Sequence, residues 1–217
     1  GCLDSFKQKV NIFDKPEVAL NLANKCLEDS VDISAIQLTG TLDSIVSYDW
    51  DLGDNTSASA KSFRYLYADT GIYTVQVYVN TANGCSDTAD GSVTIHPIPK
   101  SSFTLNDVCL GDTVYTTNTS SIAKGTISII YWDYGSGYTQ GSDSQFLTPS
   151  TIGPASIGLK TQSDKGCTDS ISTDYNVFYK EPLALHTQQG ICENATIVVV
   201  STLNQLDSVA LTTWITN

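Results

Sequence analysis

The sequence predicts an all-β chain built from tandem antiparallel β-sandwiches. Three observations support that prediction: a sequence repeat of about 83 residues, strands that alternate apolar and polar residues, and turns that contain glycine. The chain has no amphipathic helical pattern of useful length. Several short strands in each repeat, separated by turn residues, are typical of a small sandwich.

The repeat is visible in cysteines, prolines and tryptophans that recur 82 or 83 residues apart. Two series of cysteine, one of proline and one of tryptophan show this spacing: Cys2, Cys85 and Cys167; Cys26, Cys109 and Cys192; Pro16, Pro99 and Pro182; Trp50, Trp132 and Trp214. A period of this length indicates an array of similar structural units.

The strand predictions rest on alternation with period two. Residues 73–79 alternate apolar and polar side chains, and shorter runs at 31–33 and 92–95 do the same. Tight hairpin turns are predicted at 82–84 and 164–166, where a glycine supplies the positive φ that such turns need.

A tyrosine corner is predicted at residues 69–73, Asp-Thr-Gly-Ile-Tyr. In such a corner the tyrosine hydroxyl, here that of Tyr73, bonds back to the backbone of the preceding loop. The second copy reads Thr-Ile-Gly-Pro-Ala at 151–155 and lacks both the aspartate and the tyrosine. We therefore expect the corner to have less support there.

The periods divide the chain into four parts. We expect residues 1–16 to be the last strand of a preceding repeat and residues 17–97 to be a complete domain. Residues 98–180 are expected to form a second, degenerate domain, and residues 181–217 the first strands of an incomplete repeat. On this interpretation the chain is a segment of a longer array. The joints are short and contain proline without a Gly/Ser run, so we expect the domains to stack end to end as a stiff rod.

Residues 48–57, Tyr-Asp-Trp-Asp-Leu-Gly-Asp-Asn-Thr-Ser, gather three aspartates around Trp50. The second copy keeps an acid, Asp133, after its tryptophan but has Ser136 where Asp54 would stand. A catalytic or metal-binding pair would be needed in every working copy. We therefore interpret the stretch as structural, with Asp51 accepting backbone N–H groups of the turn. Structural roles are assigned to Trp50, Asp51, Gly53, Tyr73, Trp132 and Asp133.

Calcium binding is the alternative interpretation of these acids. Hard cations bind clustered carboxylates, and the candidate ligands are Asp49, Asp51, Asp54 and Asp69. The spacing is not that of an EF-hand. Apart from that alternative, no metal and no cofactor are predicted.

Composition and motifs argue against several other functions. The net charge of −12 disfavours binding to nucleic acid phosphates or anionic lipid surfaces, and no run of 18 apolar residues is present to insert into a membrane. The sequence has no nucleophile elbow, HExxH motif or phosphate-binding glycine loop. We therefore predict no catalytic and no cofactor-binding residue.

Three segments resemble PKD (polycystic kidney disease) domains: Trp-Asp-Leu-Gly-Asp at 50–54, the run at 69–79, and Asn-Gly-Cys-Ser-Asp-Thr at 83–88. Together with Cys109–Val114, they are similar to tandem repeats in giant surface proteins of Bacteroidota. The resemblance implies an Ig-like sandwich fold and a bacterial cell-surface or secreted location. It further implies arrays like those of gliding-motility adhesins exported by type IX secretion.

Two functions are consistent with this resemblance. The first is a rigid stalk or filament of a surface adhesin, with neighbouring repeats of the same chain, surface glycans or other filament chains as partners. The second is an accessory carbohydrate- or protein-binding module of a secreted hydrolase. That module would need an exposed aromatic patch, for which Tyr65, Tyr67 and Tyr78 are the candidates.

The cysteines lack CxxC spacing, which favours disulfides in an oxidising setting over zinc or redox chemistry. Pairing within each domain would join Cys26 to Cys85 and Cys109 to Cys167. In an Ig-like sandwich, however, Cys26 and Cys85 belong at opposite ends, about 23 Å apart along a seven-residue strand. A disulfide needs Cα atoms within about 7 Å. We therefore favour a Cys26–Cys167 bond across the joint between the domains.

Six Asp-Ser/Thr triplets followed by an apolar residue resemble the O-glycosylation motif of Bacteroidota. The candidate acceptors are Ser30, Ser44, Thr88, Thr113, Ser170 and Ser208. Plain strand-edge sequence is the alternative interpretation for some of them.

Overall fold

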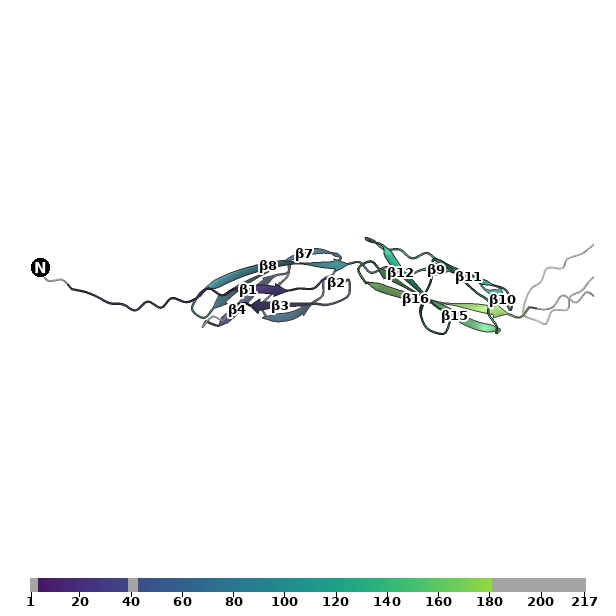
Figure 1. The fold of residues 1–217 in the computed structure, drawn as a ribbon, viewed down its shortest axis with the longest axis horizontal. Helices are drawn as coiled ribbons and strands as arrows, with labels where there is room; N and C mark the ends of the chain where they lie inside the picture. Colours follow the sequence, from purple (N-terminus) through teal and green to yellow (C-terminus); the bar gives the residue numbers. More distant parts are fainter. Residues whose placement is uncertain (1–3, 39–42, 181–217) are drawn as a thin grey trace, which may run out of the picture.

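The structure is a computed structural model that describes residues 4–38 and 43–180. Two β-sandwiches lie end to end and give the described part of the molecule an elongated, rod-like shape (Figure 1). All regular elements in these residues are β-strands, which confirms the predicted all-β fold class. The described residues contain no helix that is long and apolar enough to span a membrane.

The first sandwich packs a three-stranded sheet, in the order β1-β3-β6, against a five-stranded sheet, in the order β2-β8-β7-β4-β5. Its strands are β1 (Val18–Asn21), β2 (Lys25–Cys26), β3 (Val31–Gln37), β4 (Ile45–Asp51), β5 (Ser57–Ala58), β6 (Ser62–Tyr65), β7 (Gly71–Thr81) and β8 (Ser86–His96). All pairings are antiparallel except that of β2 with β8.

The second sandwich repeats this topology, with sheets in the order β14-β11-β9 and β10-β16-β15-β12-β13. Its strands are β9 (Phe103–Thr104), β10 (Val108–Cys109), β11 (Val114–Asn118), β12 (Ile127–Asp133), β13 (Thr139–Gln140), β14 (Ser144–Leu147), β15 (Gly153–Ser163) and β16 (Thr168–Phe178). Again the short strand β10 runs parallel to the last strand of its domain.

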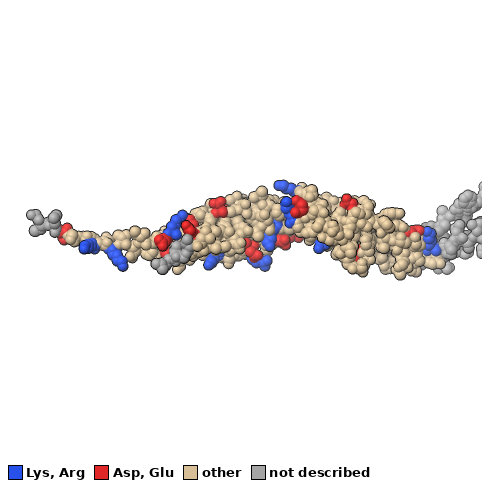
Figure 2. Space-filling view, viewed as in Figure 1, with Lys and Arg blue, Asp and Glu red and all other residues tan. Residues whose placement is uncertain are grey.

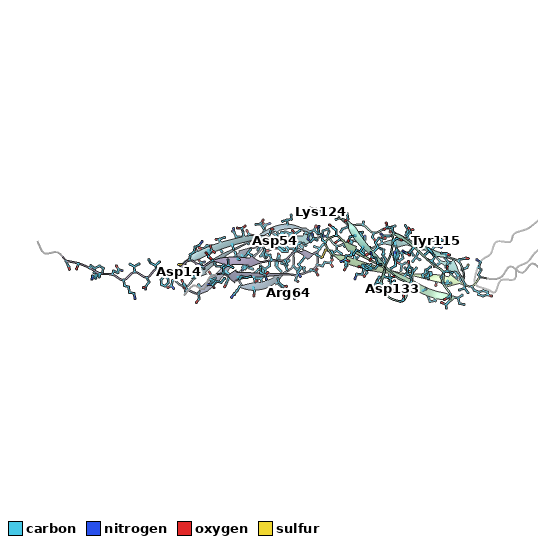
Figure 3. All side chains as sticks on the ribbon, viewed as in Figure 1. Asp14, Asp54, Arg64, Tyr115, Lys124 and Asp133 are labelled. Atoms are coloured by element: carbon cyan, nitrogen blue, oxygen red, sulfur yellow. A yellow bond between two sulfur atoms is a disulfide. The ribbon has the colours of Figure 1, made fainter. Side chains whose placement is uncertain are left out.

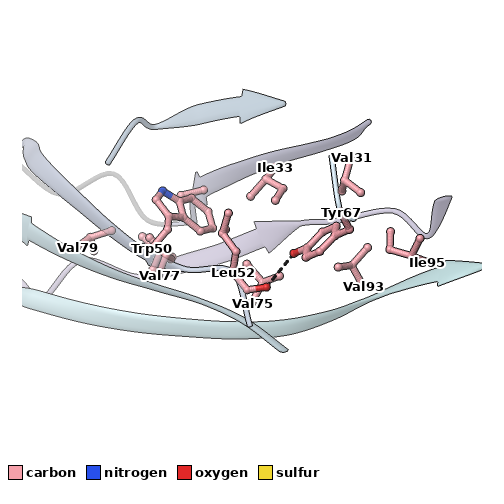
Figure 4. Close-up of a cluster of buried hydrophobic side chains, with 12 residues drawn as sticks. Val31, Ile33, Trp50, Leu52, Tyr67, Val75, Val77, Val79, Val93 and Ile95 are labelled. Carbon is pink, nitrogen blue, oxygen red and sulfur yellow. Dashed lines mark hydrogen bonds between the residues drawn. The ribbon is translucent and has the colours of Figure 1, made fainter. Parts of the chain in front are cut away.

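Alternation along the strands explains how each core is filled. In β7 every second side chain from Val75 to Val79 is fully buried, and the residues between them are exposed. Trp50, 3% exposed, lies between the two sheets, with Leu52 beside it and Tyr67 on the far side of Leu52 (Figure 4). Trp132 has the equivalent position in the second core.

The strand predicted in residues 1–16 is not seen in the part of that segment which the structure describes, residues 4–16. Residues 4–17 have no strand assignment, and residues 4–15 are exposed. A strand needs a neighbour that completes its hydrogen bonds, and the neighbours expected here belong to a preceding repeat. The assignment of this segment to such a repeat stays a prediction. The incomplete repeat predicted at 181–217 lies outside the described residues.

The joint between the sandwiches runs from the end of β8 to the start of β9. Pro99 and Ser101 are buried there. The Ser101 N–H donates to Asp169 at 2.6 Å, and the Ser101 hydroxyl lies 2.9 Å from that of Thr161. Lys100 forms an isolated antiparallel bridge with Ser121. The joint is therefore packed onto the second sandwich.

Candidate functional site

The acidic corner of the first sandwich is built from hydrogen bonds within the turn that follows β4. The Asp51 carboxylate accepts the Gly53 N–H at 2.9 Å. Gly53 has φ of +79°, and a Cβ atom there would lie 2.5 Å from the Thr74 carbonyl oxygen, so only glycine fits. In the second sandwich the Asp133 carboxylate accepts the N–H groups of Gly135 and Gly137 at 2.8 and 2.9 Å.

Asp54 lies in the same corner and accepts three hydrogen bonds. The donors are the Thr56 hydroxyl at 2.5 Å, the Thr56 N–H at 3.1 Å and the Tyr65 hydroxyl at 2.7 Å. Partial burial raises the pKa of the Asp54 carboxyl, but these hydrogen bonds together outweigh it, and the pKa lies below its usual value. Figure 3 labels Asp54 and Asp133 in the two successive sandwiches.

The other aspartates named for calcium do not complete a cation site with Asp54. Asp69 contributes its backbone carbonyl oxygen, which accepts the Tyr73 hydroxyl at 2.9 Å, and this contact is the predicted tyrosine corner. Asp49 is exposed in β4. Within residues 4–38 and 43–180, no group of three or more His, Cys, Asp or Glu side chains could hold a metal ion. Calcium binding stays a prediction, and the geometry gives this corner a structural role.

The prediction that Tyr65, Tyr67 and Tyr78 form an exposed aromatic patch is wrong. Tyr67 is 2% exposed, and its hydroxyl donates to the Leu52 carbonyl oxygen at 2.9 Å inside the core. Its ring stacks on that of Tyr73 with centroids 4.1 Å apart. Tyr67 follows β6 in a loop, where period-two alternation no longer predicts which way a side chain points.

An exposed aromatic pair is found instead on the three-stranded sheet of the second sandwich. Tyr115 and Phe146 are directly opposite each other on β11 and β14, and they are 66% and 73% exposed. The equivalent pair of the first sandwich is an ion pair, in which Arg64 Nε lies 3.1 Å from the Asp32 carboxylate. This aromatic pair was not predicted, although the period of 82 or 83 residues aligns Tyr115 with Asp32 and Phe146 with Arg64.

A disulfide joins Cys26 of the first sandwich to Cys167 of the second, with Cα atoms 5.7 Å apart. Cys26 lies beside His96, because β2 pairs in parallel with the last residues of β8. Cys167 follows the hairpin between β15 and β16 at the end of the second sandwich that faces the first. The structure thus contains the pairing across the joint, and the two alternative pairs within domains are absent: Cys85 and Cys109 are free thiols.

A groove of about 340 Å³ lies at the same joint. Its walls include Ile72, His96 and Pro97 from the first sandwich and Ile122, Lys124 and Lys165 from the second. Figure 3 shows Lys124 at this junction. On the face shown in Figure 2, charged side chains are scattered singly or in small groups, without a continuous basic surface.

Five of the six candidate glycosylation acceptors lie in described residues. Ser44, Thr88 and Ser170 are exposed, whereas Ser30 and Thr113 are half-buried. Ser208 lies outside the described residues. Two of the preceding aspartates have a structural role, because Asp87 and Asp169 accept the backbone N–H groups of Val18 and Ser101. Glycosylation stays a prediction.

Comparison with known proteins gives a family match for the first sandwich. Residues 14–95 match the model of the family described as PKD domain. The chain is similar to the PKD1 domain of the Vibrio cholerae metalloprotease PrtV, at 27% identity and TM-score 0.34, over 37% of this chain and 98% of that one.

Two further solved structures are similar. The PKD1 domain of Vibrio anguillarum Epp has 25% identity and TM-score 0.34, over 39% of this chain and 96% of that one. The fibronectin(III)-like modules of Clostridium thermocellum CbhA have 15% identity and TM-score 0.41, over 79% of this chain and 100% of theirs. No curated protein matches the sequence. The family match therefore covers the first sandwich, and the second shares its strand order.

Proposed function

We propose that this chain is a non-catalytic segment of a long extracellular repeat protein, and that its sandwiches form a rigid stalk or filament of a bacterial surface adhesin. Adhesion or gliding motility is the proposed role, and type IX secretion the proposed export route. The observation that carries the proposal is the Cys26–Cys167 bond, which joins two successive domains covalently at their junction. A bond in that place restricts bending between the domains.

The packing of the joint supports the same function. Pro99 has a fixed φ and is buried, and Ser101 is held by hydrogen bonds to Asp169 and Thr161. The linker, which these contacts fix to the second sandwich, and the disulfide connect the two sandwiches at two separate places. Domains linked by a single flexible segment would be expected to reorient freely.

An extracellular location agrees with the chemistry of the chain. Disulfides persist in oxidising compartments and are rare in the cytosol. The matched family consists typically of non-catalytic modules. The excess of acidic over basic residues, 23 against 11, suits an exposed surface protein that does not bind nucleic acid or insert into a membrane.

Small-angle X-ray scattering of the 217-residue chain tests the stalk. We expect the oxidised protein to scatter as one extended particle with a narrow range of angles between the sandwiches. A Cys26→Ser/Cys167→Ser variant should show a wider range, and the matched control Cys85→Ser/Cys109→Ser should scatter like the wild type. A wide range of angles in the oxidised wild type would contradict a rigid stalk.

A binding module is the second candidate, and the exposed pair Tyr115 and Phe146 is the observation that favours it. Large exposed aromatic side chains are common where proteins recognise ligands. The ligand would be a surface glycan or a protein, bound on the outer face of the β14-β11-β9 sheet.

Pull-down on immobilised glycans and collagen separates the two functions. Saturable binding that is lost in Tyr115→Ala/Phe146→Ala would favour the module. The matched control is Asp32→Ala/Arg64→Ala, which alters the equivalent pair of the other sandwich. Absence of saturable binding to either surface would leave the stalk as the better account.

A further inference from the structure

The two free thiols occupy the same structural positions as the two bonded ones. Cys85 follows the hairpin before β8 just as Cys167 follows the hairpin before β16. Backbone bonds of 2.8 Å, from the Thr81 N–H to the Cys85 carbonyl and from the Ser163 N–H to the Cys167 carbonyl, close the two hairpins. Thr81 and Ser163 also accept the cysteine N–H groups through their hydroxyls, both at 3.1 Å.

Cys109 matches Cys26 in the same way. Each lies in a short strand parallel to the end of its domain's last strand, beside Phe178 and His96 respectively. The residue after each cysteine, Leu110 or Leu27, donates its N–H to the carbonyl of that neighbour at 2.8 Å. The two free thiols therefore lie at the outer ends of the two-domain rod, where further joints would be.

A contact made by Cys85 indicates what lies beside it in such a joint. Its Sγ atom is 3.9 Å from the carbonyl oxygen of Phe13. Phe13 precedes His96 by 83 residues, in segments that otherwise align as Val-Asn-Ile and Val-Thr-Ile. Because Cys26 lies beside His96, the corresponding cysteine of a preceding repeat would lie beside Phe13. It would therefore be close to Cys85.

We propose that Cys85 and Cys109 are disulfide attachment sites for neighbouring repeats, so that each joint carries the same bond as Cys26–Cys167. The partner of Cys85 is a cysteine equivalent to Cys26, and the partner of Cys109 is one equivalent to Cys167. This inference rests on the proposed stalk function. Each bond forms as two thiols lose two protons and two electrons to a disulfide oxidant, which is reduced to two thiols.

The segment between these two cysteines follows an extended course along both sandwiches. Residues 86–96 are the whole of β8. In the second sandwich the Ser101 N–H bonds to Asp169, and Cys109 pairs with Phe178. Residues 101–109 therefore run alongside residues 169–178 of β16 over nearly the same number of residues. The bond from the Asn176 N–H to Asp107, at 2.7 Å, fixes the same alignment between those two positions.

A segment that is already extended can lengthen only slightly under tension. A β-strand rises about 3.3 Å per residue, and a fully extended chain reaches at most about 3.6 Å per residue. Repeated bonds of this kind would link extended segments through the whole array. The remaining parts of each domain, at 27–84 and 110–166, would lie outside the tensioned path.

Peptide mapping of the full-length protein, alkylated and digested without reduction, tests the attachment sites. We expect a peptide containing Cys85 linked to a Cys26-type peptide, and one containing Cys109 linked to a Cys167-type peptide. Non-reducing gel electrophoresis then distinguishes partners in the same polypeptide, which give a monomer band, from partners in a second one, which give multimers. Either result supports the proposal.

Two results would overturn it. One is recovery of Cys85 and Cys109 as alkylated free thiols after incubation with oxidised glutathione, and the other is linkage of either cysteine within its own domain. Neither outcome affects the scattering test of the stalk, since that experiment depends on the Cys26–Cys167 bond. Cys85→Ser and Cys109→Ser variants, each lacking only its own linked peptide, are the matched controls.

Discussion

The two sandwiches share a topology but fill the same corner in different ways. In the first, Tyr67 lies in a loop, and its ring packs in the core and stacks on the ring of Tyr73. The hydroxyl of Tyr73 makes the tyrosine corner. At the equivalent places the second has Pro149 and Ala155. There Tyr134, which replaces Leu52, stacks on Trp132 with centroids 6.3 Å apart. An aromatic ring thus packs into both cores, but from a different point of the chain.

The features that hold the joints differ much less between the sandwiches. Asp87 and Asp169 each accept an N–H group from the first residues of their domain, and in each domain a short strand pairs in parallel with the end of the last strand. A core can be refilled by another side chain of similar volume. A joint between domains depends on particular backbone positions and tolerates less change.

The largest effect is expected from removing the tryptophan of either core. Trp50 and Trp132 pack edge-on against Phe63 and Phe103, with centroids 5.5 and 5.3 Å apart. Replacing either by alanine should lower the free energy of unfolding of its sandwich by about 3–5 kcal/mol. Urea unfolding followed by circular dichroism measures the loss. A much smaller loss in one sandwich would show that its core does not depend on the shared tryptophan.

A sharper comparison uses two core tyrosines whose hydroxyls differ in hydrogen bonding. The Tyr67 hydroxyl donates to Leu52, whereas that of Tyr134 is buried without a hydrogen bond. Burial raises the pKa of the Tyr134 hydroxyl, and the nearby Thr116 side chain lowers it by less. The Thr116 hydroxyl itself donates to the Gln145 carbonyl at 3.3 Å. The Tyr134 ring therefore contributes packing without a bond from its hydroxyl.

Tyr67→Phe should destabilise the first sandwich by about 1–3 kcal/mol, because a buried carbonyl loses its donor. Tyr134→Phe should leave the second unchanged or more stable, because it removes an unpaired buried hydroxyl. Thermal unfolding of both variants measures the contrast. Equal losses would mean that the two hydroxyls are equally well satisfied.

The smallest effect concerns pH and the corner that contains Asp54 in one sandwich and Ser136 in the other. The pKa of Asp54 is lower in the folded state than its usual value of 3.8, so its contribution to stability is present above that value. It is lost as the pH falls through the folded pKa. Asp54→Ala should therefore be less stable than wild type at pH 6, and the difference in stability should narrow as the pH falls below 3.8. A gap that does not change with pH would contradict this role.

Much of the fold could be predicted because it follows from local patterns. Alternation at 73–79 identifies β7, and the strand order of an Ig-like sandwich, repeated in successive domains, brings Cys26 and Cys167 to one joint. The side-chain direction of Tyr67 could not be predicted, since it lies in a loop where packing alone decides. Nor does the sequence indicate that Tyr134, at the position of Leu52, packs against Trp132 in the second sandwich. A strand was predicted in residues 1–16, and the structure assigns none in residues 4–16, because alternation in the sequence does not show whether a neighbouring strand is there to pair with.

The central claim is that the Cys26–Cys167 bond joins successive sandwiches covalently, so that in the 217-residue chain with Cys85 and Cys109 free the residues between the bonded cysteines carry no tension. Single-molecule force spectroscopy of the 217-residue chain, held at its two ends, tests this directly. The two cysteines are separated by 141 positions, so complete extension of the reduced protein should exceed that of the oxidised one by about 500 Å at ~3.6 Å per residue. Cys26→Ser/Cys167→Ser should behave like the reduced protein in the absence of reductant. Equal extensions of oxidised and reduced wild type would contradict the claim.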